Sequence, residues 1–242
     1  MKQYIAALIL IVTVVISSCS REFIPPEDVE LGKEYYPIHQ NHMVEYQVDS
    51  IIYNDFTETT DTFNMQFRDE FADEFMDNQQ RPSRVVHRYY RQDSTYEWVD
   101  LMTYYVTQTS FRTEVVENNF RFMKMVYPVK INTRWFGNSL IPTNVNLEFQ
   151  WLKEWEYKYQ NVNEGFDNGL RFFPATVTIL QADDVEGNPN SPNDFSAYTF
   201  SKEVYAKGVG LVYKELTRWE YQPQVKKYKK GFTLIMRAIK HA

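Results

Sequence analysis

The sequence has only one cysteine, Cys19, among its 242 residues. A single thiol excludes an intramolecular disulfide, and it leaves thiol chemistry to one position close to the N-terminus. Basic residues are also few, since 26 lysines and arginines face 32 aspartates and glutamates. A nucleic-acid partner requires a basic footprint to neutralise phosphates, so this balance argues against nucleic-acid binding.

Glycine is scarce as well, with eight residues in the chain. The segment Gly208-Val209-Gly210 lacks the third glycine and the following helix that a dinucleotide fingerprint requires. No Gly-x-Ser-x-Gly elbow is present to display a serine nucleophile. The sequence therefore predicts no nucleotide cofactor, and it offers no motif for nucleophilic catalysis.

Histidine is too sparse to predict a metal site. His39 and His42 lie three residues apart, and His87 is the only other histidine well inside the chain. A zinc site needs three or four ligands in tetrahedral geometry, which two histidines in a loop do not supply. We expect no bound metal and no cofactor.

Apart from the N-terminus, the chain lacks a long apolar run. Residues 4–16 form a continuous apolar segment with one threonine, preceded by Lys2 and followed by Ser17, Ser18 and Cys19. This layout is typical of a secretory signal, and the apolar run is too short for a membrane-spanning helix. The segment Ile16-Ser17-Ser18-Cys19 resembles the lipobox of bacterial lipoproteins, which implies cleavage after residue 18 and acylation of Cys19.

This interpretation divides the chain into three parts. Residues 1–18 are a lipoprotein signal peptide, residues 19–34 an extended tether with Pro25-Pro26, and residues 35–242 a single β-rich domain. Removing the signal takes away one basic residue, Lys2, so the mature chain carries 25 basic and 32 acidic residues. We expect the acylated cysteine to hold this domain at a membrane of the bacterial cell envelope, the outer membrane in preference to the inner one.

Aromatic residues are abundant, at 17% of the chain. With alternating apolar and polar positions in segments such as 43–53, 63–67 and 173–180, they favour strands. Asn118-Asn119 predicts a tight turn between the strands 111–116 and 120–129. We predict an all-β antiparallel domain of about ten strands, strongly curved into an open barrel or sandwich, with little helix after the signal peptide.

A second aromatic group stands out in residues 149–160, where the alternation predicts one long strand. Trp151, Trp155, Tyr157 and Tyr159 fall on one face of that strand. They are weak candidates for a ligand-binding site, either a sugar-stacking platform or the lining of an apolar pocket. The other interpretation, that they are ordinary core residues, stays open and is favoured because one face of such a strand must be buried.

Paired carboxylates suggest a different class of function. Asp69-Glu70, Asp73-Glu74 and Asp183-Asp184 could serve a hydrolase if two of them flanked a substrate, although such pairs are usually solvated. A third possibility is a structural subunit of an envelope complex, which an exposed apolar patch would favour. The leading hypothesis is a non-catalytic β domain that binds an apolar ligand, a glycan or another envelope protein.

Two longer segments support the envelope assignment. Residues 117–129 (ENNFRFMKMVYPV) and 205–213 (YAKGVGLVY), taken with the lipobox, resemble uncharacterised lipoproteins of Bacteroidetes-type bacteria. The resemblance covers most of the mature chain. It implies an envelope lipoprotein with a β-rich domain, and it supplies no catalytic residue.

Overall fold

The computed structural model describes residues 30–144, 147–224 and 226–242. Its compact unit runs from Leu31 to Ala242 and begins slightly before the expected domain start at residue 35. The predicted signal peptide, Cys19 and most of the predicted tether lie outside the described residues. Within the described ranges, no helix has the length and apolar character needed to cross a membrane.

The described residues form one antiparallel sheet of twelve strands. Two short 3-10 helices, η2 (Lys33–Tyr35) and η3 (Leu147–Leu152), accompany it. The strands are β1 (Met43–Asn54), β2 (Thr59–Met76), β3 (Pro82–Arg91), β4 (Val99–Gln108), β5 (Arg112–Glu117), β6 (Phe120–Val126), β7 (Arg134–Phe136), β8 (Glu156–Asp167), β9 (Phe172–Gly187), β10 (Ser196–Ala206), β11 (Gly210–Gln222) and β12 (Lys226–His241).

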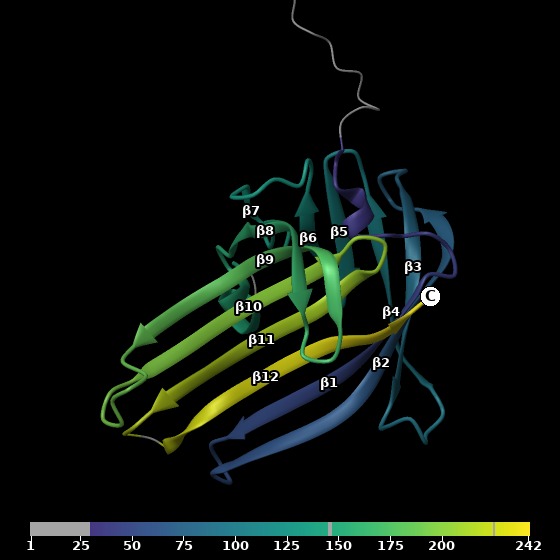
Figure 1. Ribbon diagram of the computed structural model, residues 1–242. Helices are drawn as coiled ribbons and strands as arrows, with labels where there is room; N and C mark the ends of the chain where they lie inside the picture. The colour runs from purple at the N-terminus through teal and green to yellow at the C-terminus, as the bar shows by residue number, and fades with distance from the viewer. Residues whose placement is uncertain (1–29, 145–146, 225) are drawn as a thin grey trace, which may run out of the picture. The chain divides into compact units, whose positions relative to one another are not determined.

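The strand order is that of two meanders joined side by side. β1 to β6 and β7 to β12 each pair with their neighbours in sequence, and β1 pairs with β12 to join the two sets. This arrangement leaves β6 and β7 as the edges of a strongly curved sheet (Figure 1).

The two edges are linked by a few hydrogen bonds, so the sheet is a nearly closed barrel. Met123 N donates to the carbonyl of Gly137 at 2.8 Å, and the indole nitrogen of Trp135 donates to the carbonyl of Met123 at 2.8 Å. The hydroxyl of Tyr159 donates to the carbonyl of Val126 at 2.8 Å.

The fold class predicted from the sequence is confirmed, with twelve strands in place of about ten. The predicted turn at Asn118-Asn119 is present, with φ of 51° and 65°, a region that asparagine tolerates better than most residues. It joins β5 to β6, which pair in antiparallel register.

The prediction of one continuous strand over residues 149–160 is wrong. Residues 147–152 form η3, and the strand β8 begins only at Glu156. Glu154 has a φ of +62°, and the indole nitrogen of Trp155 donates to the carbonyl of Trp151 at 2.7 Å. This local bond holds the chain in a turn between η3 and β8. The alternation of apolar and polar residues over 149–160 therefore does not correspond to one extended strand.

Candidate functional site

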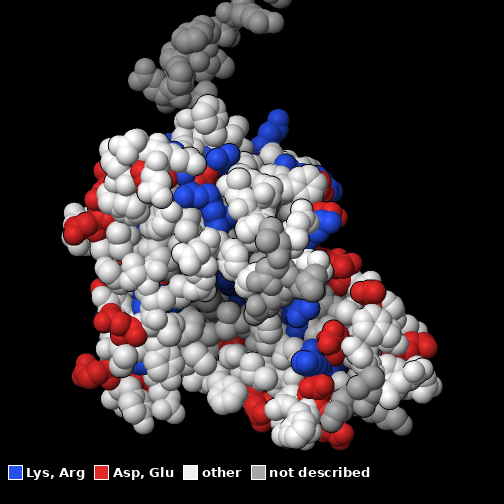
Figure 2. All heavy atoms as spheres, turned by 180° about the vertical axis from the view of Figure 1, so that it is seen from behind, with Lys and Arg blue, Asp and Glu red and all other residues white. Residues whose placement is uncertain are grey.

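The concave face of the sheet encloses a cavity with three compartments. We call the middle one the chamber, of about 230 Å³, the deep narrow one the inner crevice, of about 50 Å³, and the outer one the mouth, of about 570 Å³. The chamber shares Trp151 and Trp155 with the mouth, and it shares Glu203 and Lys214 with the inner crevice. The compartments therefore adjoin one another. Figure 2 shows the face opposite to that of Figure 1, which is hollowed near its centre with basic side chains inside the hollow.

Aromatic side chains line the chamber. They come from β6, from η3 and the turn after it, and from the start of β8, and they are Phe120, Phe122, Phe149, Trp151, Trp155 and Tyr157. Trp151 and Trp155 meet edge to face with ring centroids 5.4 Å apart, and Phe120 and Phe149 do so at 4.5 Å. A concave surface lined in this way suits an apolar group of about one ring system.

The inner crevice is charged, and its centre is Glu203 on β10, which is 1% exposed. The carboxylate accepts hydrogen bonds from Lys124 Nζ at 2.7 Å, from the Tyr205 hydroxyl at 2.7 Å and from Gln181 Nε2 at 2.8 Å. Burial by itself raises the pKa of this carboxyl. The charges of Lys124 and Lys214 and the hydrogen bonds outweigh burial and bring the pKa to about 2. Glu203 is therefore a fixed, fully partnered anion.

A second ion pair lies beside it, between Arg88 on β3 and Asp69 on β2. The guanidinium donates to both carboxylate oxygens at 2.7 and 2.8 Å, and the Tyr104 hydroxyl adds a third bond to Asp69 at 3.0 Å. Such bidentate geometry fixes both groups in place. Glu117 on β5 lies 3.6 Å from Arg88. The hydrogen bonds of this ion pair are therefore satisfied by groups of the protein itself.

Two charged groups in this region are less well partnered. Lys214 on β11 has one ion-pair contact among the described residues, Glu203 at 3.7 Å, and Glu117 has only the contact with Arg88 at 3.6 Å. Neither distance is a hydrogen bond. Burial lowers the pKa of the Lys214 ammonium, Lys124 lowers it further, and Glu203 opposes both. Both side chains line the chamber as well as the inner crevice.

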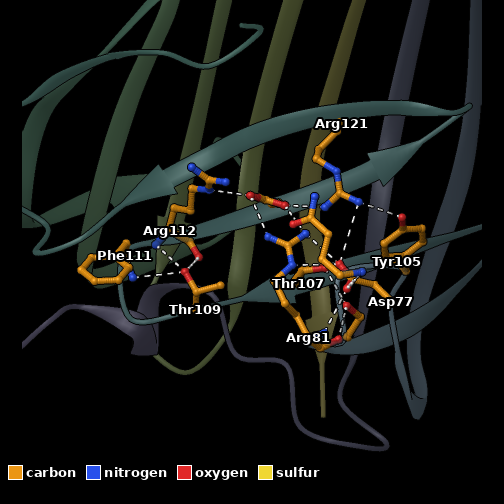
Figure 3. A network of polar contacts seen from close by, with 11 residues as sticks. Asp77, Arg81, Tyr105, Thr107, Thr109, Phe111, Arg112 and Arg121 are labelled. Carbon is orange, nitrogen blue, oxygen red and sulfur yellow. Dashed lines mark hydrogen bonds and ion pairs between the residues drawn. The ribbon is translucent and has the colours of Figure 1, made fainter. Parts of the chain in front are cut away.

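A separate polar network surrounds Glu114 on β5, and Figure 3 shows its members Asp77, Arg81, Arg112 and Arg121. Arg81 Nη2 donates to this fully buried carboxylate at 2.9 Å, and Arg112 and Arg121 donate to it as well. Asp77 accepts a bond from Arg81 Nη2 at 2.7 Å. Burial raises the pKa of Glu114, but the three guanidinium groups outweigh it and lower that pKa. Because every charge in this network has a partner inside the protein, we assign it a structural role.

The structure separates the four predicted ligand-binding aromatics. Trp151 and Trp155 are half-buried and line both the chamber and the mouth. Tyr157 is 1% exposed, lines the chamber and donates to Asn138 Oδ1 at 2.8 Å. Tyr159 is fully buried and bonds to Val126, so it belongs to the hydrophobic core.

The structure also shows where the predicted carboxylate pairs lie. Asp69 is buried and paired with Arg88, whereas Glu70 pairs with Arg68 at 2.9 Å. Asp73 accepts a bond from Gln40 at 2.9 Å. Asp183 and Asp184 lie on β9 and line the mouth. Across the ranges that the structure covers, no three His, Cys, Asp or Glu side chains are grouped to hold a metal ion.

Sequence reasoning missed the charged residues of the cavity, namely Arg88, Glu117, Lys124, Glu203 and Lys214. Strand alternation places a residue on one of two faces, but here both faces carry charges. Lys202 and Glu203 are consecutive, for example, and only Glu203 is buried. The one available signal was a run of polar and aromatic residues in β10 without a clear apolar face.

No protein-family model and no curated protein sequence matches the chain. Among solved structures, it is similar to a Bacteroides fragilis protein described as exported and as having a YmcC-like fold. That similarity has 9% identity and a TM-score of 0.32 over 85% of this chain and 98% of that one. The chain is also similar to LprF from Mycobacterium bovis. That similarity has 10% identity and a TM-score of 0.18, over 82% of this chain and 85% of LprF. Similarities at this level leave function to be inferred from the chain's own residues.

Proposed function

We propose that this protein is a cell-envelope lipoprotein whose barrel binds a small molecule in the chamber. The observation that carries the proposal is the chamber itself, with six aromatic side chains as its walls and a charged inner crevice next to it. Ligand sites are typically concave and mostly apolar, with a few placed polar groups that orient the ligand.

The anchor is argued from the sequence. Residues 4–16 and Ile16-Ser17-Ser18-Cys19 support export, cleavage and acylation of Cys19. Acyl chains on this residue hold the protein at a membrane without a spanning helix, most stably when there is more than one chain. The compact unit begins at Leu31, so the cysteine lies only a short distance along the chain from the barrel. We propose that this anchor holds the protein at a membrane of the cell envelope, the outer membrane in preference to the inner one.

The partners of the cavity carboxylates favour binding over catalysis. Glu203 accepts three hydrogen bonds from protein groups, and Asp69 is held by Arg88 and Tyr104. A carboxylate with its pKa near 2 is a poor proton donor or acceptor at neutral pH. These groups therefore form a fixed electrostatic environment for a bound molecule.

Indole provides a test because it is apolar, aromatic and small enough for the chamber. Isothermal titration calorimetry would use the full chain in phosphatidylcholine nanodiscs, with empty nanodiscs as the reference. We expect saturable binding that is lost in Leu216→Trp, because Leu216 lines the chamber and the larger ring fills it. The matched variant Leu101→Trp places the same ring at a 49% exposed position on β4 and should bind normally. Equal binding by both variants would show that indole binds elsewhere and would refute the proposal.

A further inference from the structure

The charges around the inner crevice balance. Three cations, Arg88, Lys124 and Lys214, face three carboxylates, Asp69, Glu117 and Glu203. Arg88 pairs with Asp69 and Lys124 with Glu203, both within 2.8 Å. Lys214 and Glu117 are left with ion contacts longer than a hydrogen bond.

These two groups are open to a ligand. The side chain of Lys214 is 22% exposed and that of Glu117 is 28% exposed, and both line the chamber. Of the described residues, none makes a hydrogen bond to Lys214 Nζ or to the Glu117 carboxylate. The chamber thus offers one ammonium with donors to spare and one carboxylate with acceptors to spare, at the end next to the inner crevice.

The balance of charge limits what can bind there. A ligand with a single net charge would add an uncompensated charge to a buried site, which is costly. A ligand with one group of each sign leaves the site neutral, gives Lys214 an acceptor and gives Glu117 a donor. Charge-assisted hydrogen bonds of this kind are stronger than hydrogen bonds between two neutral groups.

We infer that the chamber binds a zwitterion with an apolar body, its anionic group on Lys214 and its ammonium on Glu117. The aromatic walls hold the apolar body, as the proposed function requires, and the inference rests on that proposal. The same head-group chemistry occurs in an α-amino acid and in an ethanolamine phosphate lipid head group.

Four probes that share a phenyl group separate the effect of charge from that of the apolar body. They are L-phenylalanine (zwitterion), 3-phenylpropionate (anion), 2-phenylethylamine (cation) and 2-phenylethanol (neutral). Calorimetry on the full chain in phosphatidylcholine nanodiscs should give L-phenylalanine at least about tenfold tighter binding than each of the others, because only the zwitterion makes a charge-assisted hydrogen bond to both Lys214 and Glu117. Dihexanoyl phosphatidylethanolamine forms a fifth arm. The lipid is the source of the head group if it binds more tightly than L-phenylalanine, and an amino acid is the source if it does not.

Two variants assign the two charges. Lys214→Met should weaken L-phenylalanine and 3-phenylpropionate by about tenfold and leave 2-phenylethylamine unchanged, and Glu117→Gln should show the opposite selectivity. Lys202→Met is a matched control, because Lys202 precedes the buried Glu203 on β10 and its ion contact is with Glu215 at 4.0 Å. The probe series on the unaltered chain decides the question even if one variant does not fold.

The outcomes separate the inference from the proposed function. If all four phenyl probes bind equally and Leu216→Trp abolishes their binding, the chamber binds ligands but the zwitterion inference is wrong. Tighter binding of 2-phenylethanol than of L-phenylalanine also overturns the inference. If neither indole nor any probe binds, both the inference and the proposed function are refuted.

Discussion

Replacing Glu114 with glutamine is expected to lower the free energy of unfolding by about 3–5 kcal/mol, the usual cost of removing one partner of a buried ion pair. Glu114 is fully buried and accepts hydrogen bonds from Arg81, Arg112 and Arg121 (Figure 3). Glutamine keeps the shape but removes the charge, and its amide group directs two N–H donors at guanidinium donors. Asp77 is then the one carboxylate left in the network. Most of the negative charge that balanced the three arginines is therefore lost.

Urea denaturation of the two chains, followed by circular dichroism, measures this difference. The matched control is Glu156→Gln, in which an exposed glutamate that pairs with the exposed Arg134 is changed in the same way. Surface ion pairs contribute about 0–1 kcal/mol, so the control should change little. A loss below about 1 kcal/mol in Glu114→Gln would mean that the network does not stabilise the barrel.

Replacing Cys19 with alanine is expected to move almost all of the protein from the membrane fraction to the soluble fraction. The thiol is the predicted acylation site, and the described residues contain no helix that could hold the chain in a bilayer. Without acyl chains, the remaining apolar contacts give at most weak, reversible attachment.

Cell fractionation with metabolic labelling by an alkyne fatty acid measures both retention and acylation. Ser20→Ala changes the next residue without touching the thiol, and it should stay in the membrane fraction with its label. Unchanged retention and labelling in Cys19→Ala would contradict the lipoprotein assignment.

Strand alternation and turn residues were enough to predict much of the fold. The turn at Asn118-Asn119 follows from the tolerance of asparagine for positive φ, and the antiparallel pairing of β5 and β6 follows from that turn. The pairing of β1 with β12 joins segments far apart in the chain, and no local pattern encodes it. The helix η3 was missed because the hydrogen bond from Trp155 to Trp151 overrides an alternation that also fits a strand.

The candidate site could be predicted only in part. Trp151 and Trp155 were among the predicted ligand-binding residues, and they line the chamber. Lys214 and Glu203 were not predicted, because a charged residue in a strand is more often on the solvated face, and the face is decided by the curvature of the whole sheet. Glu114 was missed for the same reason, since its three arginine partners come from two other segments as well as from β5.

Native mass spectrometry of the full chain, extracted gently from the cell envelope, tests the central claim most directly. We predict a non-covalent small-molecule adduct on the acylated chain, present in Leu101→Trp and absent in Leu216→Trp, whose larger side chain fills the chamber. An unaltered chain that carries no adduct, or an adduct that Leu216→Trp retains in full, would contradict the assignment of this barrel as a ligand-binding lipoprotein.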